Sequence, residues 1–542
     1  MNKELYDWQE ECLERWFEHN GRGIVQAVTG SGKTLLALSA MDRLNQKLNG
    51  SLRVKIVVPT GALMRQWNQA LREYLAAAPS SDSAAANGTA GLNAPHSALL
   101  PDSSSIRNDI GLRGAGSKST PDHKYMIYVI NSARYELARQ ILTELRQGAD
   151  ILLIADECHH YESAQNQLIF EFLPYISEYE SHFFSLGLSA TLPAGASQRC
   201  LTSVLGRKIY HYGMKEAAAG NTISPYDVYH ISLSFRADER DEYEEFTDQM
   251  TLLYGKLLKA YPALRTLTQK ERFEELQSIA GSKKNALSKT AATYMNLTFK
   301  RRRLVCLASA RVSCVCDLIR RLDIHEKILI FGERISQAEE LYRLLKEVLP
   351  EKAGRLHSKM GSQANKNVLE RFRTGSIRIL IACKAIDEGF DVPDATVGII
   401  LSGTSTKRQR IQRLGRIIRR KETNAGAALY YLHITETVEE ACYLPDAGEH
   451  RLFELSYDAE TQSFCNPAYD DRADRLLSEM EQNGADAATL QEAKRCLLLG
   501  CVRSDWKLPP EILDRHIQTA RYTSEKNYWV CMKKLYSLHV TQ

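Results

Sequence analysis

A glycine-rich stretch near the N-terminus has the residues that bind nucleoside phosphates. Residues 27–34 read AVTGSGKT and lie between an apolar run, 24–28, and an amphipathic run, 35–48. A strand that turns into a helix presents backbone amides to phosphate oxygens, while Lys33 adds a positive charge and the Thr34 hydroxyl can bind magnesium. Ala27 stands where the general GxxxxGK[ST] pattern has glycine, so the prediction also depends on this strand and helix context. The candidate phosphate-binding residues are Thr29, Gly30, Ser31, Gly32, Lys33 and Thr34.

Two adjacent carboxylates follow another apolar run. Residues 151–155 read ILLIA and residues 156–160 read DECHH. A buried parallel strand ends at the sheet edge where ligands bind, so Asp156 and Glu157 would lie beside the phosphate loop. Asp156 could hold magnesium through a water molecule, and Glu157 could orient and deprotonate the attacking water. A zinc site at His159 and His160 would need an HExxH-type spacing, which is absent.

A basic segment in the second half of the chain supplies candidate catalytic cations. Residues 412–420 read QRLGRIIRR, and in a helix Gln412, Arg416 and Arg419 fall on one face. Paired guanidinium groups suit the charge that develops on a transferring γ-phosphate. An isolated arginine run is more often a solvated helix or a localisation signal. The catalytic interpretation therefore depends on the phosphate loop and the two carboxylates.

The elements that would position these residues form two α/β sets. In the first, short apolar runs at 24–28, 54–58, 125–130, 151–155 and 183–188 predict buried parallel strands, with helices at 35–48, 63–75 and 133–145. In the second, strands are predicted at 328–331, 355–357, 377–382, 397–401 and 428–432, with a helix at 335–348. The rhythm predicts two doubly wound α/β domains, spanning 1–215 and 326–436.

Three other segments lack this rhythm. Residues 79–121 are rich in Ser, Ala, Gly and Pro, which predicts a flexible insertion, with a partner-binding segment as the alternative. Residues 216–325 are charged and helical in pattern, and we expect a helical connector between the two domains. Residues 437–542 contain helical stretches such as 473–499 and no recognisable motif, so we expect a mainly helical segment whose role is unknown.

The composition is that of a globular protein with several domains. The 542 residues are 44% hydrophobic and 25% charged, which excludes collagen-like, wholly disordered and disulfide-scaffold proteins. A net charge of +4 means that local patches must hold any polyanion. The 12 cysteines include no CxxC pair, which argues against a zinc ribbon. Without a signal-peptide pattern or an apolar run near the ~20 residues of a membrane span, we expect a cytoplasmic protein, nucleoid-associated in a prokaryote, with a nuclear location open.

Eight strings in fixed order carry a family resemblance. They are Gln9, AVTGSGKT, VVPTGALMRQW, DECHH, SAT, ILIFGER, AIDEGFDVPD and QRLGRIIRR. Together they resemble the superfamily 2 DEAD/DEAH-box helicase core, nearest to its XPB-type branch, over about residues 5 to 435. The resemblance implies two RecA-like domains in tandem with ATP and Mg²⁺ as cofactors.

The resemblance also implies roles for single residues. Gln9 matches the glutamine that reads adenine, and an amide side chain suits its donor and acceptor edge. Gly389 and Asp391 match a motif that touches the nucleotide and the nucleic acid, and Ser189 and Thr191 match the motif that couples hydrolysis to strand movement.

A further group matches positions that contact the nucleic-acid backbone. Pro59, Thr60 and Gly61 follow the strand at 54–58, with Arg65 and Gln66 on the next helix. Amides at a helix start hold a phosphate without reading sequence, so binding should tolerate any sequence. Arg334 matches the position where the nucleic-acid-binding surface of the second domain, its track, begins in the family. A role in a surface salt bridge would explain an arginine there equally well.

The leading hypothesis is an ATP-dependent helicase or translocase, with DNA favoured by the XPB-type resemblance. One alternative is a duplex DNA translocase that serves a separate nuclease in a restriction or defence assembly. Another is an ATPase switch or scaffold gated by a protein partner through residues 79–121 or 437–542. No membrane is expected as a partner.

Overall fold

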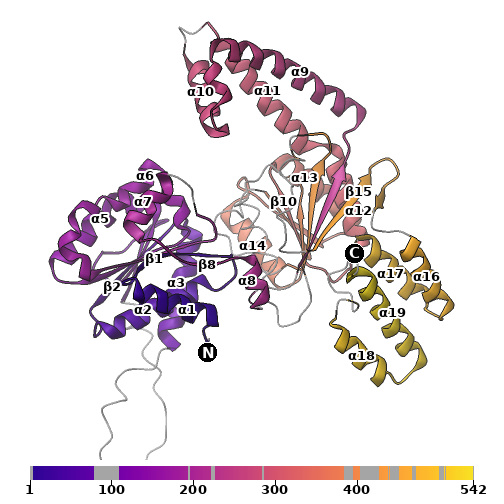
Figure 1. The fold of residues 1–542 in the computed structure, drawn as a ribbon, viewed down its shortest axis with the longest axis horizontal. Helices are drawn as coiled ribbons and strands as arrows, with labels where there is room; N and C mark the ends of the chain where they lie inside the picture. The colour runs from indigo at the N-terminus through magenta and orange to yellow at the C-terminus, as the bar shows by residue number, and fades with distance from the viewer. Residues whose placement is uncertain are drawn as a thin grey trace, which may run out of the picture. The chain divides into compact units, whose positions relative to one another are not determined.

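The computed structural model divides the chain into two compact units. Of the residues that the structure describes, those up to 222 belong to the first unit and those from 226 onward belong to the second. The structure describes residues 4–77, 109–192, 196–220, 222, 226–282, 286–383, 395–402, 427–437, 439, 451–466, 471–499, 506 and 508–540. Each unit is built on its own sheet (Figure 1).

The sheet of the first unit has the order β4-β3-β5-β2-β6-β7-β1-β8. Its strands are β1 (Arg22–Ala27), β2 (Leu52–Val58), β3 (Ile110–Gly114), β4 (Ser117–Lys118), β5 (Tyr125–Val129), β6 (Asp150–Ala155), β7 (Phe183–Ser189) and β8 (Lys208–Tyr212). All neighbours are parallel except β3 and β4, which are antiparallel. The inner strands β5 and β6 are buried along their whole length, as expected where helices cover both faces.

The first unit also contains seven described α-helices. They are α1 (Asp7–Glu18), α2 (Lys33–Lys47), α3 (Gly61–Ala77), α5 (Ile130–Arg146), α6 (Ala164–Gln167), α7 (Ala196–Leu205) and α8 (Met214–Ala219). Of these, α1, α2, α3, α5 and α7 pack onto the sheet. A 3-10 turn, η2 (Cys158–Glu162), follows β6. Because α2, α3 and η2 each begin at the carboxyl end of a parallel strand, the predicted functional residues meet at one edge of the sheet.

The sheet of the second unit has the order β11-β12-β10-β13-β14-β9-β15-β16. Its strands are β9 (Tyr226–Leu233), β10 (Ile328–Gly332), β11 (Ala353–Leu356), β12 (Ile379–Cys383), β13 (Val397–Ile400), β14 (Ala427–Ile434), β15 (Arg451–Asp458) and β16 (Ser463–Cys465). Only β15 and β16 pair antiparallel among these neighbours. The two parallel-rich sheets confirm the predicted α/β class with two doubly wound domains.

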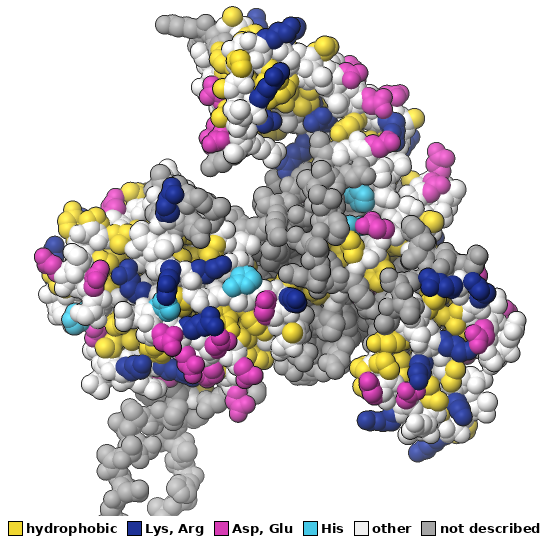
Figure 2. Space-filling model, in the orientation of Figure 1, with side chains coloured by type: hydrophobic (Ala, Val, Ile, Leu, Met, Phe, Trp, Pro, Cys, Tyr) yellow, Lys and Arg dark blue, Asp and Glu magenta, His cyan; other side chains and the backbone are white. Residues whose placement is uncertain are grey.

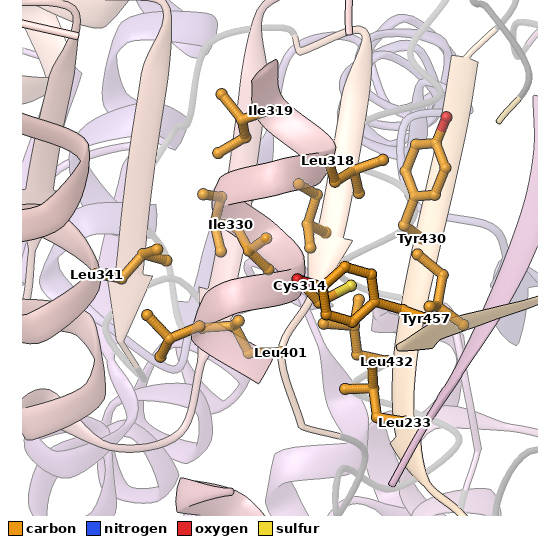
Figure 3. Close-up of a cluster of buried hydrophobic side chains, with 14 of the residues drawn as sticks. Leu233, Cys314, Leu318, Ile319, Ile330, Leu341, Leu401, Tyr430, Leu432 and Tyr457 are labelled. Carbon is orange, nitrogen blue, oxygen red and sulfur yellow. The ribbon is translucent and has the colours of Figure 1, made fainter. Parts of the chain in front are cut away.

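Helix α12 (Ser309–Arg321) contributes many of the buried side chains in the core of the second unit. Beside the same sheet lie α13 (Ile335–Val348) and α14 (Ser362–Arg373). Figure 3 shows Cys314 and Leu318 of α12 among side chains of the strands, including Ile330 and Leu432. The α13 bounds equal those predicted from its apolar spacing.

Two further groups of helices have cores of their own. In one, α9 (Ala237–Ala260) and α10 (Gln269–Gly281) pack on α11 (Ser288–Leu307) around Leu257, Leu264 and Leu276 (Figure 1). The other comprises α16 (Asp471–Gln482), α17 (Ala487–Leu499), α18 (Pro510–Thr519) and α19 (Thr523–Val540), packed around Trp506 and Met532. Among the described helices none is long and apolar enough to cross a bilayer.

Three segment predictions were partly wrong. Within the expected flexible insertion 79–121, β3 and β4 add two strands to the first sheet, while residues 78–108 lie outside the described residues. The expected helical connector 216–325 contains β9, and the expected mainly helical segment 437–542 contains β15 and β16. Two glycines interrupt the apolar pattern of β3, and Asp227 and His230 interrupt that of β9. These segments form strands because they pair with strands distant in the sequence.

Basic and acidic side chains lie close together on the surfaces of both units in the view of Figure 2. This mixture agrees with the small net charge of +4. Any polyanion must therefore be recognised by local geometry rather than by the charge of the whole protein.

Candidate nucleotide-binding site

The loop between β1 and α2 has the backbone of a phosphate cradle. Gly30 and Gly32 have φ angles of 89° and 91°, in the left-handed region that glycine adopts without strain. A Cβ at Gly32 would lie 2.8 Å from Gln9 Nε2, so no larger residue fits there without movement. The Ser31 hydroxyl donates to the Val28 carbonyl at 2.7 Å and closes the turn. Lys33 is the first residue of α2, two residues before the predicted start of this helix at 35.

The polar groups of this loop fit an anionic ligand. Lys33 Nζ donates to the carbonyl oxygens of Ala27 and Val28 at 3.0 and 3.4 Å, so its charge is held by neutral groups. The buried Thr29 hydroxyl has no hydrogen-bond partner among the described residues. A phosphate would supply the partner that the Thr29 hydroxyl lacks and would form an ion pair with Lys33.

An open cleft of about 950 Å³ lies over this loop, lined wholly by the first unit. Thr34 and Lys33 line its floor together with both predicted carboxylates, Asp156 and Glu157. It continues between α2 and α3, where Trp67 is part of its wall. A cleft of this size that joins a phosphate cradle to two carboxylates can accommodate a nucleoside triphosphate with a divalent cation.

Asp156 follows β6 directly and is anchored through both carboxylate oxygens. Oδ2 accepts a hydrogen bond from Trp67 Nε1 at 2.8 Å, and Oδ1 accepts one from the Glu157 backbone amide at 3.0 Å. Burial raises the pKa of Asp156, while the Trp67 bond and the charge of Lys33 act in the opposite direction. A divalent cation in the cleft would favour the ionised carboxylate further.

Glu157 adopts an uncommon backbone conformation for its residue type. Its φ of 45° lies in the left-handed region, just before η2 begins. Such a conformation costs on the order of 1–3 kcal/mol in a residue other than glycine and is concentrated at functional sites. Here it turns the chain at the sheet edge so that Asp156 and Glu157 both line the cleft.

A chain of polar contacts leads from Glu157 to the SAT motif. Glu157 Oε2 lies 3.3 Å from His159 Nδ1, which lies 2.8 Å from Ser189 Oγ. The Ser189 hydroxyl donates to the Thr191 carbonyl at 2.5 Å and accepts from the Thr191 amide at 3.2 Å. Because the serine proton points to Thr191, His159 Nδ1 must be the donor toward Ser189. The structure thus joins the predicted base to both predicted coupling residues.

Gln9 is fully buried and both ends of its amide are engaged. Nε2 donates to the Gly32 carbonyl at 3.0 Å, and Oε1 accepts from the Tyr6 amide at 2.9 Å. These contacts tie the start of α1 to the phosphate loop. The role of Gln9 in reading adenine stays a prediction.

The predicted nucleic-acid residues of the first unit gather at the start of α3. The Thr60 hydroxyl accepts from the Leu63 amide at 3.3 Å, and Pro59 precedes it. A Cβ on Gly61 would come within 2.5 Å of Ala115 Cβ, so glycine lets the turn between β3 and β4 approach. Arg65 is exposed on the first turns of α3.

Other predicted residues lie elsewhere or outside the described part. Arg334 is exposed just before α13 in the second unit, and no ion pair joins it to the described residues. Five residues lie outside the described residues, and their roles stay predictions: Gly389, Asp391, Gln412, Arg416 and Arg419.

Two residues of the site were missed in the sequence. Trp67 was noticed only as the last letter of a motif, and His159 only as a zinc ligand to be dismissed. Their partners, Asp156 and Ser189, are 89 and 30 residues away in the chain. The aromatic residue at the end of the motif and the histidine after the carboxylates were the available signals.

Family models match both halves of the core. Residues 2–194 match the model described as type III restriction enzyme, res subunit, and residues 310–421 match the helicase conserved C-terminal domain. The chain is 26% identical to the DNA 3'-5' translocase XPB2 of Sulfurisphaera tokodaii over 424 residues, 78% of this chain and 80% of the relative.

Two further proteins extend the comparison. The helicase/translocase subunit XPB of general transcription and DNA repair factor IIH from Encephalitozoon cuniculi is 22% identical over 81% of this chain, and the match spans only 53% of that relative. The crystal structure of the Pyrococcus furiosus Hef helicase domain covers 80% of this chain and 96% of its own, with a TM-score of 0.48 and 16% identity. The two matched family models and the XPB relative confirm the resemblance: the chain has a superfamily 2 helicase core, the core of a class of ATP-dependent enzymes, with XPB proteins among its relatives.

Proposed function

We propose that this protein is an ATP-driven translocase or helicase that acts on DNA. One observation carries the proposal: the phosphate loop and the Asp156–Glu157 pair line one cleft, and Glu157 contacts the SAT motif through His159. A protein that only binds nucleotide has no need of a catalytic base, here Glu157, that is connected to the SAT motif. A motor needs such a connection, because hydrolysis must change the contacts made elsewhere in the protein.

In this proposal the residues of the cleft divide the work of phosphoryl transfer. The loop amides and Lys33 hold the β- and γ-phosphates, and Thr34 and Asp156 hold Mg²⁺, Asp156 through a water molecule. Bound Mg²⁺ neutralises charge on the phosphate oxygens. Glu157 orients the attacking water and accepts its proton. Gln412, Arg416 and Arg419 complete the proposed set as groups that stabilise charge on the γ-phosphate.

The contacts of His159 suggest how hydrolysis at Glu157 is coupled to the SAT motif. Its Nδ1 donates to Ser189 Oγ at 2.8 Å and lies 3.3 Å from Glu157 Oε2. When Glu157 takes a proton from water it loses its negative charge, and its attraction for His159 weakens. His159 then bonds Ser189 more fully, which strengthens the link to Thr191. Hydrolysis thereby changes the backbone contacts that follow β7.

The start of α3 supplies the proposed track of the first unit. Thr60 and Gly61 offer backbone groups, and the exposed Arg65 offers a charge to a phosphate. Gly389, Asp391 and Arg334 would extend this track from the second half of the chain. One XPB relative is named a DNA 3'-5' translocase, and the other is named a helicase/translocase subunit of a transcription and DNA repair factor, which favours DNA over RNA. Such an enzyme would work where DNA is, in the cytoplasm at the nucleoid or in a nucleus.

A second candidate is a duplex DNA translocase that serves a separate nuclease. The observation that favours it is the match of residues 2–194 to the res subunit of type III restriction enzymes. The two candidates share the ATP site and differ in the product. The first separates the strands of a tailed duplex, whereas the second moves along duplex DNA without separating the strands.

Steady-state ATP hydrolysis tests both proposals. The purified protein is measured without nucleic acid and with single-stranded DNA, duplex DNA or RNA, and the Glu157→Gln variant controls for contaminating ATPase. Stimulation by single-stranded DNA supports the helicase, whereas stimulation by duplex DNA supports the nuclease-serving translocase when a parallel unwinding assay shows no separation of a tailed duplex. A rate that no nucleic acid changes but a protein partner raises would replace both with a partner-gated switch.

A further inference from the structure

Trp67 makes a contact that the chemistry assigned to the cleft does not use. Its indole Nε1 donates to Asp156 Oδ2 at 2.8 Å, and its side chain is only 1% exposed. Asp156 is 7% exposed, so this bond lies away from bulk water. A hydrogen bond from a buried donor to a carboxylate is stronger than one between neutral groups.

The geometry leaves the Asp156 carboxylate little freedom. One oxygen is held by Trp67 of α3 and the other by the Glu157 amide at the start of η2. Two donors on two oxygens determine the plane of the group, and the remaining lone pairs are available to a cation or its water ligands. A ligand held by hydrogen bonds in this way binds its metal more tightly than one that rotates freely.

Trp67 also lies on the helix that carries the proposed track. Thr60 caps α3 and Arg65 is exposed on it, two residues before Trp67. A movement of the start of α3 therefore moves the indole N–H relative to Asp156. The same short helical segment carries the residues of the proposed track at one end and the donor to the proposed Mg²⁺ carboxylate at the other.

A second buried tryptophan shows that burial alone does not require an indole N–H to donate to a carboxylate. Trp16 is also 1% exposed, and its Nε1 donates to the Ser185 backbone carbonyl at 3.0 Å. An indole N–H can thus be satisfied by a neutral carbonyl within the same unit. Trp67 instead donates to a carboxylate that lines the nucleotide cleft.

We propose that Trp67 is a positioning residue that sets Asp156 for Mg²⁺ and transmits nucleic-acid binding at the start of α3 to the ATP site. The inference rests on the proposed function of the cleft. It adds a route from the track to the metal site that does not pass through Glu157, His159 and Ser189.

The test compares two tryptophan substitutions of the same kind. Trp67→Phe keeps a buried aromatic ring and removes the N–H, and Trp16→Phe does the same at a site that does not touch Asp156. Isothermal titration calorimetry gives the affinity for ADP with Mg²⁺ and with EDTA. Hydrolysis is then measured against Mg²⁺ concentration, with and without DNA.

We expect Trp67→Phe to weaken ADP binding about tenfold in Mg²⁺ and to leave it unchanged in EDTA. The Mg²⁺ concentration for half-maximal hydrolysis should rise by a similar factor, and the stimulation by DNA should fall. Trp16→Phe should match the wild type in every measurement. Wild-type Mg²⁺ dependence and wild-type DNA stimulation in Trp67→Phe would overturn the inference.

A measurement on the wild-type protein covers the case in which Trp67→Phe does not fold. The chain has five tryptophans, and their ¹⁵N-labelled indole resonances can be assigned by elimination from variants of the other four. Adding Mg²⁺ to the ADP complex should shift the Trp67 resonance and leave that of Trp16 in place. An unmoved Trp67 signal in a protein that binds Mg²⁺ and ADP would refute the inference. A wild-type protein that binds no nucleotide would instead refute the proposed function.

Discussion

Removing the Ser189 hydroxyl should slow hydrolysis without weakening ATP binding. The hydroxyl meets His159 Nδ1 at 2.8 Å and makes two bonds with the backbone of Thr191. In Ser189→Ala the His159 proton has only Glu157 Oε2 left among these partners, at a present distance of 3.3 Å. The bond to Glu157 should therefore shorten and strengthen.

The size of the effect follows from the strength of that bond. A hydrogen bond to a charged group contributes about 1.5–3 kcal/mol, and whatever stabilises the Glu157 carboxylate makes it a weaker base. The full amount corresponds to a loss of about 10- to 150-fold in kcat. Because the existing contact at 3.3 Å already supplies part of this energy, we expect a loss of about tenfold. The KM for ATP should stay within about twofold, since the phosphate loop is untouched.

Ser185→Ala is the matched control for this experiment. Ser185 is a buried serine on the same strand, β7, and its hydroxyl donates to the Leu205 carbonyl at 3.1 Å. It loses a buried hydrogen bond as Ser189→Ala does, but it does not contact His159. Steady-state kinetics at saturating DNA should separate the two variants. Equal kcat values for both, or a change confined to KM in Ser189→Ala, would show that the reasoning about Glu157 is wrong.

Three more substitutions test other parts of the structure. Gly32→Ala should weaken ADP binding at least tenfold by calorimetry, because φ is 91° and the new Cβ would meet Gln9 Nε2 at 2.8 Å; unchanged affinity would refute the cradle geometry. Lys55→Met should destabilise the first unit by about 3 kcal/mol in urea unfolding, since Glu144 would lose the buried Nζ at 2.7 Å and keep only the partly exposed Arg53 at 3.6 Å; Lys55→Met with Glu144→Leu should recover most of this loss. Arg416→Ala should lower kcat and leave ADP affinity unchanged, and wild-type turnover would remove Arg416 from the proposed catalytic set.

The strands of both cores were predictable because they are short and buried on both faces. The run ILLIA at 151–155 has apolar residues throughout, and it forms β6 almost to the residue. The β9 strand shows why others were not. Its eight residues pair with β14, about 200 positions later in the chain, and its polar Asp227 and His230 give no local sign of that partner. Burial in the completed sheet, rather than local pattern, makes β9 a strand.

Some parts of the candidate site could be predicted from the sequence, and others could not. The phosphate loop and the two carboxylates could be predicted because each follows a recognisable strand, and parallel strands bring their carboxyl ends to one edge. The contacts from Trp67 to Asp156 and from His159 to Ser189 could not be predicted, because each joins residues of different elements at a distance that no spacing rule encodes. The sequence therefore indicates which groups do the chemistry, and the fold decides which groups hold them.

The central claim is that hydrolysis in this cleft drives movement along DNA. The most direct test is the rate of ATP hydrolysis at saturating DNA of increasing length, with Glu157→Gln as the control for contamination. A motor spends less time leaving and rebinding on longer DNA, so we expect the rate to rise with length and then level off. A rate that is the same on every length above the binding footprint, or the same with no DNA at all, would contradict the account.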